Sequence, residues 1–193
     1  MNFLGHLKVV NSHRFKVMKY CFKVGLYKQG LLHDLSKYSP TEFFVGVKYF
    51  QGTRSPNVME RIEKGYSSAS LHHTGRNKHH FQYWIDFDEN KCYYKGMPMP
   101  ANYVVEMFMD RIAACETYQK ENYTERSPLN YFLNQDLKPY VDKRALHLLE
   151  KLLYMLAEKG RDYTFKYIKY NLKREKRKNR TKKFNKLINK LFK

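Results

Sequence analysis

Apolar residues recur at intervals of three and four along most of the chain, which is the spacing of one helix face and not the alternation of a strand. From His13 to Leu32, apolar side chains such as Phe15 and Phe22 follow this period, and Gly25 and Gly30 interrupt it. Because glycine weakens a helix interior, the segment predicts one helix, a turn and a short second helix.

Later segments give the same picture. Ser39-Pro40-Thr41-Glu42 has the order of a capping box with proline at the first helical position, and predicts a helix through Phe50. Further helices are expected from Asn57, after Pro100 to about Tyr118, and from an N-cap at Asp142 to Gly160. The turn-rich segment 86–100 favours a small hairpin. The predicted fold is all-α: a helical bundle with a small irregular or hairpin insertion and a basic C-terminal helix.

Composition narrows the class of protein. The 193 residues suit one domain, and 42% hydrophobic and 16% aromatic residues are too many for a disordered chain. Three widely spaced cysteines without a CxxC pair argue against a disulfide scaffold and fit a reducing cytosol. No apolar run approaches the ~20 residues that span a bilayer, and the N-terminus lacks the pattern of a signal peptide. A cytoplasmic protein is expected.

The charge is unevenly distributed. The chain has 37 Lys+Arg and 18 Asp+Glu, a net charge of +19. Residues 171–193 hold eleven Lys+Arg and one acid, +10, which leaves +9 on residues 1–170. This predicts a helical domain, 1–170, which also contains the candidate metal ligands described below, and a basic amphipathic tail, 171–193, whose apolar stripe includes Phe184, Leu187 and Leu191. Such a tail suits a nucleic-acid backbone, an anionic membrane, or packing on the body or on a second copy in an oligomer.

Histidines and acids carry the candidate chemistry. Asp110 lies on an otherwise apolar segment with Glu106 one turn before it, and a buried carboxylate is costly unless it is paired or bound to metal. Imidazole and carboxylate together suit Mn, Fe, Co, Ni or Zn. The candidate metal ligands are His13, His33, Asp34, His72, His73, His79, His80 and Asp110.

This order resembles the H…HD…H…H…D signature of the HD-domain metal-dependent phosphohydrolases. Leu31-Leu32-His33-Asp34-Leu35-Ser36-Lys37 is similar to the core motif of that superfamily, and the extra histidines are similar to its binuclear branch, which includes the HD-GYP-type phosphodiesterases. More narrowly, HDLSKYSPTEF, HHTGRNKHHFQYW and MPMPANYVVEMFMD resemble a small uncharacterised family of HD-like proteins in bacteria and phages. The match covers roughly residues 10–135.

The resemblance implies a cytoplasmic enzyme, in a bacterium or a phage-infected cell, with one or two divalent metals. His13, His33, Asp34 and Asp110 would hold one ion, and Asp34 would bridge to a second ion held by one histidine of each doublet. The implied reaction is hydrolysis of a phosphate mono- or diester, nucleotide-type substrates included, by a metal-activated water. Asp34, Lys37 and Glu106 are the candidate catalytic residues, and Lys37, Asn77 and Arg111 the candidate contacts to the anionic substrate.

Several alternatives stay open. The short spacing between His13 and His33 makes His6 a substitute first ligand, and no GYP motif follows the second doublet. Glu42, in its capping box, is expected to be structural. A diiron HD-like oxygenase would keep the fold with another reaction, and a nucleic-acid-binding protein would use the histidines structurally.

Overall fold

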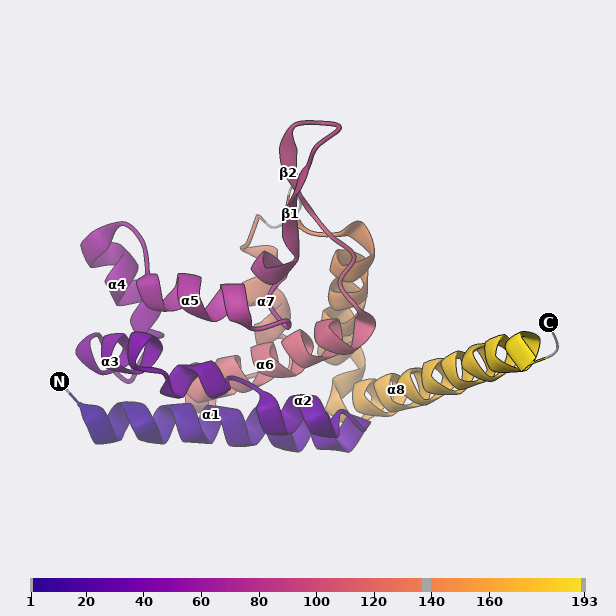
Figure 1. Ribbon diagram of the computed structural model, residues 1–193. Coiled ribbons are helices and arrows are strands. Elements are labelled where there is room, and N and C mark those ends of the chain that lie inside the picture. The colour runs from indigo at the N-terminus through magenta and orange to yellow at the C-terminus, as the bar shows by residue number, and fades with distance from the viewer. Residues whose placement is uncertain (1, 137–139, 192–193) are drawn as a thin grey trace.

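The computed structural model describes residues 2–136 and 140–191, with side chains to residue 179. It confirms the all-α prediction (Figure 1). The longer helices are α1 (Phe3–Val24), α3 (Pro40–Lys48), α4 (Pro56–Lys64), α5 (Ser68–Arg76), α6 (Ala101–Gln119) and α8 (Lys143–Leu191). The short elements are α2 (Tyr27–Leu32), η1 (Leu35–Tyr38), η2 (Phe81–Trp84), η3 (Lys120–Asn122), α7 (Ser127–Leu133) and a β1 (Ile85–Asp88), β2 (Tyr93–Gly96) pair.

Helix α6 forms the centre of the core. Its Val104, Phe108 and Ile112 are fully buried, and it packs against α1 on one side and α8 on the other. In Figure 1, α1 runs beneath α6, with α5 and the hairpin on the opposite side. This arrangement places the acids of α6 beside residues that come much earlier in the chain.

The first helical segment differs in part from its prediction. Helix α1 begins at Phe3, ten residues before the expected start at His13. It ends at Gly25, whose φ of 86° lies in the left-handed region that only glycine adopts freely. Gly30 lies inside α2, so the turn lies at Gly25, and the predicted helix, turn and short second helix are confirmed.

The predicted capping box does not form. Helix α3 starts at Pro40 as expected, but Ser39 makes no side-chain cap hydrogen bond. Its Oγ is buried without a hydrogen-bond partner among the described residues. Glu42, which a capping box would turn back toward residue 39, instead reaches two histidines of α5.

The predicted hairpin is confirmed, and its base rests on the start of α8. β1 and β2 pair antiparallel, with Ile85 opposite Gly96. Gly96 lies so close to the backbone of residues 140–142, just before α8, that a Cβ on it would be 2.5 Å from the Asp142 nitrogen. Asp142 caps α8 as expected, with Oδ2 accepting from the Ala145 N–H at 3.1 Å.

The predicted end of the last amphipathic helix at Gly160 corresponds to a kink inside α8, where one helical part ends and a second begins. Gly160 has φ 74° and ψ 174° and produces a kink, after which α8 continues to Leu191. The expected boundary at residue 170 falls inside this helix, and Leu172 just beyond it is buried. The division into a domain and a tail stays a prediction, and the tail's apolar stripe lies beyond the described side chains. In the described part of the chain, none of the helices combines the length and apolar character needed to cross a membrane.

Candidate metal centre

A backbone reversal after α2 turns His33 and Asp34 toward the interior. α2 ends at Leu32, His33 is extended at ψ 129°, and Asp34 adopts a left-handed conformation with φ 53°. Aspartate tolerates this region better than most residues, yet it carries backbone strain that the surrounding packing must offset. The result is a carboxylate only 2% exposed, held between α1, α5 and α6.

Four side chains from three parts of the chain form the first ligand group: His13, His33, Asp34 and Asp110, with ligand atoms all within 4.8 Å of one another. His13 Nε2 lies 2.9 Å from Asp110 Oδ1. His33 Nε2 lies 3.6 Å from Asp34 Oδ1 and 3.7 Å from Asp110 Oδ1. Helices α1 and α6 and the turn after α2 thus converge on one point.

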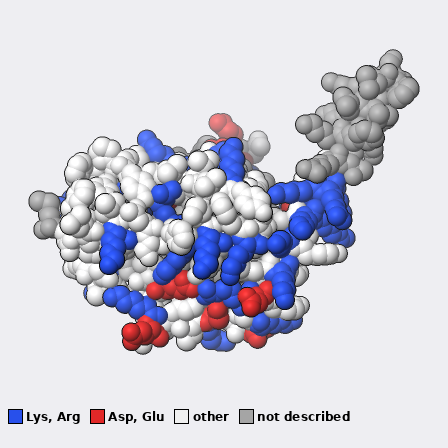
Figure 2. Space-filling model, turned by 90° about the horizontal axis from the view of Figure 1, so that it is seen from below, with Lys and Arg blue, Asp and Glu red and all other residues white. Residues whose placement is uncertain are grey.

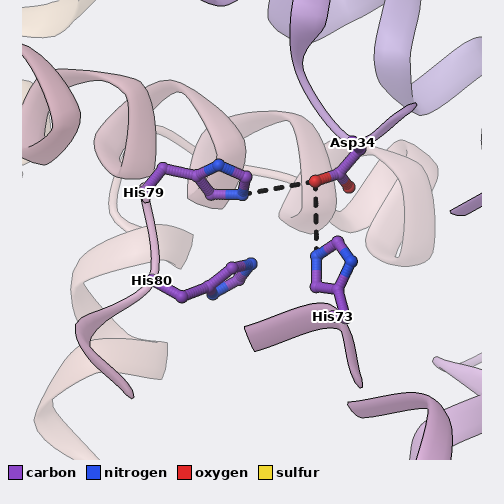
Figure 3. Close-up of side chains that lie close together, drawn as sticks. All are labelled: Asp34, His73, His79 and His80. Carbon is purple, nitrogen blue, oxygen red and sulfur yellow. Dashed lines mark ion pairs between the residues drawn. The ribbon is translucent and has the colours of Figure 1, made fainter. Parts of the chain in front are cut away.

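The second ligand group shares Asp34 with the first. It consists of Asp34, His73, His79 and His80 (Figure 3). The Nε2 atoms of His73 and His79 each lie 3.3 Å from Asp34 Oδ1, and the ring of His80 faces the same space. His73 comes from the last turn of α5. His79 and His80 follow the end of that helix, so their side chains are not turned about 100° apart as adjacent helical residues are, and both reach the same group.

Two glutamates orient the histidines from behind. Glu106 Oε1 is 3.0 Å from His33 Nδ1 and 3.2 Å from His79 Nδ1. Glu42 Oε2 is 2.8 Å from His73 Nδ1. A carboxylate only accepts hydrogen bonds, so each Nδ1 donates its hydrogen, and Nε2 is the nitrogen that faces Asp34 and would coordinate a metal once it has lost its proton. Glu106, His33 and His79 also lie close enough together to form a third ligand group. Their Nδ1–Oε1 distances are those of hydrogen bonds, however, so we interpret Glu106 as a support for the two rings.

Electrostatics hold the acids ionised. Burial alone would raise the pKa of Asp34, but the charges of His33, His73 and Lys37 bring it well below its usual range. The pKa of Asp110 is likewise well below normal because hydrogen bonds from His13 and His33 outweigh its burial. Both carboxylates are therefore charged at neutral pH.

The histidines divide into two kinds. Burial would lower the pKa values of His33, His73 and His79, but the neighbouring carboxylates raise them. The pKa of His80 falls well below normal because of burial and repulsion from His79 and His73. His80 is neutral and ready to coordinate, whereas a metal must displace protons from the others.

The donor atoms fit a divalent transition metal. Among the described residues, the buried atoms without a hydrogen-bond partner include His33 Nε2, Asp34 Oδ1, His79 Nε2 and His80 Nε2. Buried polar atoms are rarely left unpaired, and these four all belong to the two ligand groups. Neutral imidazoles and carboxylates are the ligands that Mn, Fe, Co, Ni and Zn accept. Either group could hold a metal ion.

Other predicted residues lie outside both ligand groups. His72 projects from α5 to Glu42, with Nδ1 2.7 Å from Oε1. His6 packs against the rings of Phe43 and Phe50. The structure thus places His13, and not His6, at the first group, and His73, and not His72, at the second.

The three expected substrate contacts occupy different surroundings. Lys37 is closest to the centre, with Nζ 3.8 Å from Asp34 Oδ2 and a partly exposed side chain. Asn77 donates to Ser36 Oγ and to the His73 carbonyl, both at 2.8 Å, and so joins η1 to α5. Arg111 points toward α7, where its Nη1 bonds Gln135 Oε1 at 3.0 Å. Only Lys37 is placed to meet a ligand at the centre.

Two residues of this site were not anticipated from the sequence. Glu42 was expected to cap its own helix, and Ser36, whose Oγ lies 3.2 Å from His73 Nδ1, was not singled out. Both follow the His33-Asp34 pair within nine residues. Their closeness in sequence to His33 and Asp34 could have pointed to them. The segment that follows the chain reversal supplies the side chains that hydrogen-bond to His73.

Fold and site together define an all-helical protein with a buried centre of histidines and carboxylates that could hold metal. The chain belongs to a family of unknown function, DUF5662, whose family model matches residues 2–155. That span includes every residue of the two ligand groups and ends before the basic segment of α8. Searches of curated proteins and of solved structures gave no match.

Proposed function

We propose that the protein is a metal-dependent phosphohydrolase of the HD type that hydrolyses a phosphate mono- or diester, with nucleotides as the leading substrate class. The observation that carries the proposal is the sharing of Asp34 by two ligand groups, each with three further donors. A carboxylate between two positions is the arrangement that holds two ions a short distance apart, as two-metal hydrolases require.

Divalent ions, when bound, supply Lewis acidity: they acidify water and offset the negative charge of a phosphoryl group. The protein's own residues do the rest. Asp34 and Asp110 neutralise the positive charge of the centre, and Glu106 and Glu42 hold three imidazole rings in the orientation that presents Nε2. Burial of His33, His79 and Asp34 keeps bulk water away.

Lys37 is the side chain proposed to bind the substrate. It is 27% exposed and within 4 Å of the shared carboxylate, so its ammonium group lies where the centre meets solvent. A flexible point charge at that position suits a phosphate oxygen. The basic character of the whole chain favours the approach of an anionic substrate.

Metal analysis and turnover test the proposal together. Purified protein should contain up to two transition-metal ions per chain and hydrolyse members of a panel of nucleotides and phosphodiesters after reconstitution with Mn, Fe, Co or Ni. Asp34→Asn and His33→Ala should abolish both properties, whereas Lys37→Gln should retain metal and lose turnover. Bound metal with oxygen consumption and intact phosphoesters would favour the oxygenase instead. Metal-free protein that binds nucleic acid would contradict the proposal.

A further inference from the structure

The N-terminal helices present a cationic surface. Residues 1–33 contain six Lys+Arg and no Asp or Glu. Of these, Lys8, Lys19 and Lys23 are exposed on α1. Successive residues of a helix are about 100° apart, so these three lysines fall within about 60° of one another around the axis. They form a row along one side of α1, and at its end the Lys23 ammonium group also lies 6.0 Å from the ring centre of Phe165 on α8.

A row of exposed apolar side chains runs beside the lysines. Leu4, Phe15 and Phe22 are 76%, 61% and 37% exposed, and they lie within about 20° of one another around α1. The ring of Phe22 contacts Tyr27 at the start of α2, with centroids 5.2 Å apart. Leu31, one turn after Tyr27, is 55% exposed. The apolar row thus extends from α1 onto α2 and costs free energy while it faces water.

The cationic row continues onto α8. Lys176 Nζ donates to the Gly25 carbonyl at 3.3 Å, so the basic segment of α8 crosses the end of α1. Residues 173–178 of that segment hold five Lys+Arg and one acid. Figure 2 shows Lys and Arg side chains spread across this face, with most of the acidic side chains in this view below them.

We infer that this surface, defined as the apolar row Leu4, Phe15, Phe22, Tyr27 and Leu31 with the adjoining row Lys8, Lys19 and Lys23, docks the protein on an anionic lipid membrane. Apolar and basic side chains in parallel rows suit the boundary between acyl chains and anionic headgroups. Lysines draw the surface to the headgroups, and leucine and phenylalanine insert below them. Leucine has no ring to stack on a nucleobase, so its presence favours lipid over nucleic acid.

Docking through this surface leaves the candidate metal centre accessible. His13 lies about 110° around α1 from the middle of the lysine row, on the side that faces α6. The membrane would therefore contact the outer side of α1 without covering the ligand groups. The inference is independent of the reaction at the centre, because none of its residues belongs to either group.

Vesicle binding by the full chain tests the inference. Sedimentation with phosphatidylcholine vesicles should show little binding, and vesicles with one third phosphatidylglycerol should bind the protein, less so at high salt. Exchange of Lys8, Lys19 and Lys23 for Gln should weaken partitioning by about fivefold for each lysine. Phe15→Ser with Phe22→Ser should weaken it too, while the residual salt dependence persists. Circular dichroism confirms that each variant is folded.

A charge-matched control separates this surface from net charge. Lys91, Lys143 and Arg144 are exposed on the hairpin turn and at the start of α8. Their exchange for Gln removes the same charge and should change partitioning far less. Equal losses in both triple variants, or no loss in the first, would overturn the inference. So would binding of a mixed-sequence single-stranded oligonucleotide, dependent on the same lysines and phenylalanines, without vesicle binding.

Discussion

His33 and His79 are joined through one atom, since the Nδ1 nitrogens of both lie within 3.2 Å of Oε1 of Glu106. The two rings are 4.4 Å apart between centroids and come from segments separated by 46 residues (79 − 33). His33 belongs to the first ligand group and His79 to the second. One carboxylate from α6 therefore sets the orientation of a ligand in each.

Glu106→Gln should weaken metal binding at both positions. The amide oxygen can still accept both N–H groups, but it lacks the negative charge, and loss of such an orienting carboxylate typically lowers metal affinity ~10–100-fold. Glu42→Gln is the matched control, because Glu42 supports His73 of the second group alone. Calorimetric titration with Co²⁺ should show both binding steps weakened in the first variant and one in the second. A change in only one step for Glu106→Gln would refute this role.

The metal-free protein should lose stability as pH rises above neutrality. The pKa values of His33, His73 and His79 are raised on folding by the surrounding carboxylates. A group of this kind stabilises the fold fully below its unfolded pKa of ~6.5, and the contribution is lost as pH rises through the folded pKa. His80, with its lowered pKa, is neutral in both states above that point and does not change the sign.

Bound metal should reverse this trend, because coordination needs neutral histidine and releases protons as it forms. Thermal unfolding from pH 6 to 9, with and without chelator, measures both directions. A melting temperature of the chelated protein that climbs over this range, or a metal-induced gain that shrinks with pH, would contradict the prediction. Asp34→Asn should flatten the dependence of the chelated protein, since it removes the charge that raises the histidine pKa values.

A further buried carboxylate, Glu60, stabilises the start of α5, the helix that carries His73. Glu60 of α4 is fully buried and accepts from Ser67 Oγ and Ser68 Oγ, both at 2.7 Å, at the start of α5. Burial alone would raise the pKa of Glu60, but the two serine hydrogen bonds lower it to about 2. Its contribution to stability is present above the unfolded pKa of ~4.3 and is lost as pH falls toward 2.

Glu60→Gln should destabilise the fold by ~1–3 kcal/mol at pH 7, because it replaces an acceptor of several hydrogen bonds with a group that is half donor. Urea unfolding measures the change. Glu63→Gln is the control: its side chain is 54% exposed and paired with Lys48, so removal should cost under ~1 kcal/mol. Similar losses in both variants would show that the buried network adds nothing.

Gly96→Ala should destabilise the contact between the hairpin and α8. The added Cβ would approach the backbone of Val141 and Asp142 within 2.6 Å, and backbone cannot rotate aside as a side chain can. A cost of ~1–3 kcal/mol is expected for such overpacking. Gly75→Ala, on α5 with open space around its Cβ position, should stabilise by up to ~1 kcal/mol. Equal effects in unfolding experiments would contradict the close approach at Gly96.

The sequence predicted the elements better than their ends. Periodicity identified the helices, yet it missed the first ten residues of α1, where His6 and Lys8 interrupt the apolar run. Gly160 correctly signalled the end of the first helical part of α8, but not the second part that follows the kink directly, whose Phe165 and Ile168 are buried. Local pattern fixes conformation, whereas tertiary contacts decide where an element stops.

The order of histidines and acids along the sequence identified the candidate ligands. It did not predict which histidine of each doublet lies at the centre. His72 and His73 are adjacent on α5, so their side chains diverge by about 100°, and only one meets Asp34. After Asn77 the helix has ended, and both His79 and His80 reach the second group. Neither this difference nor the left-handed backbone of Asp34 can be read from spacing, because both depend on how the turns pack.

The first ligand group joins residues 97 positions apart, since Asp110 of α6 meets His13 of α1 (110 − 13 = 97). During synthesis, His13, His33 and Asp34 leave the ribosome long before their fourth partner does. The nascent chain would therefore offer only an incomplete set of donors until α6 emerges and docks. Metal binding at this position is accordingly expected to follow the folding of α6. The ion would then bind a domain that has already folded and would not be needed to start its folding.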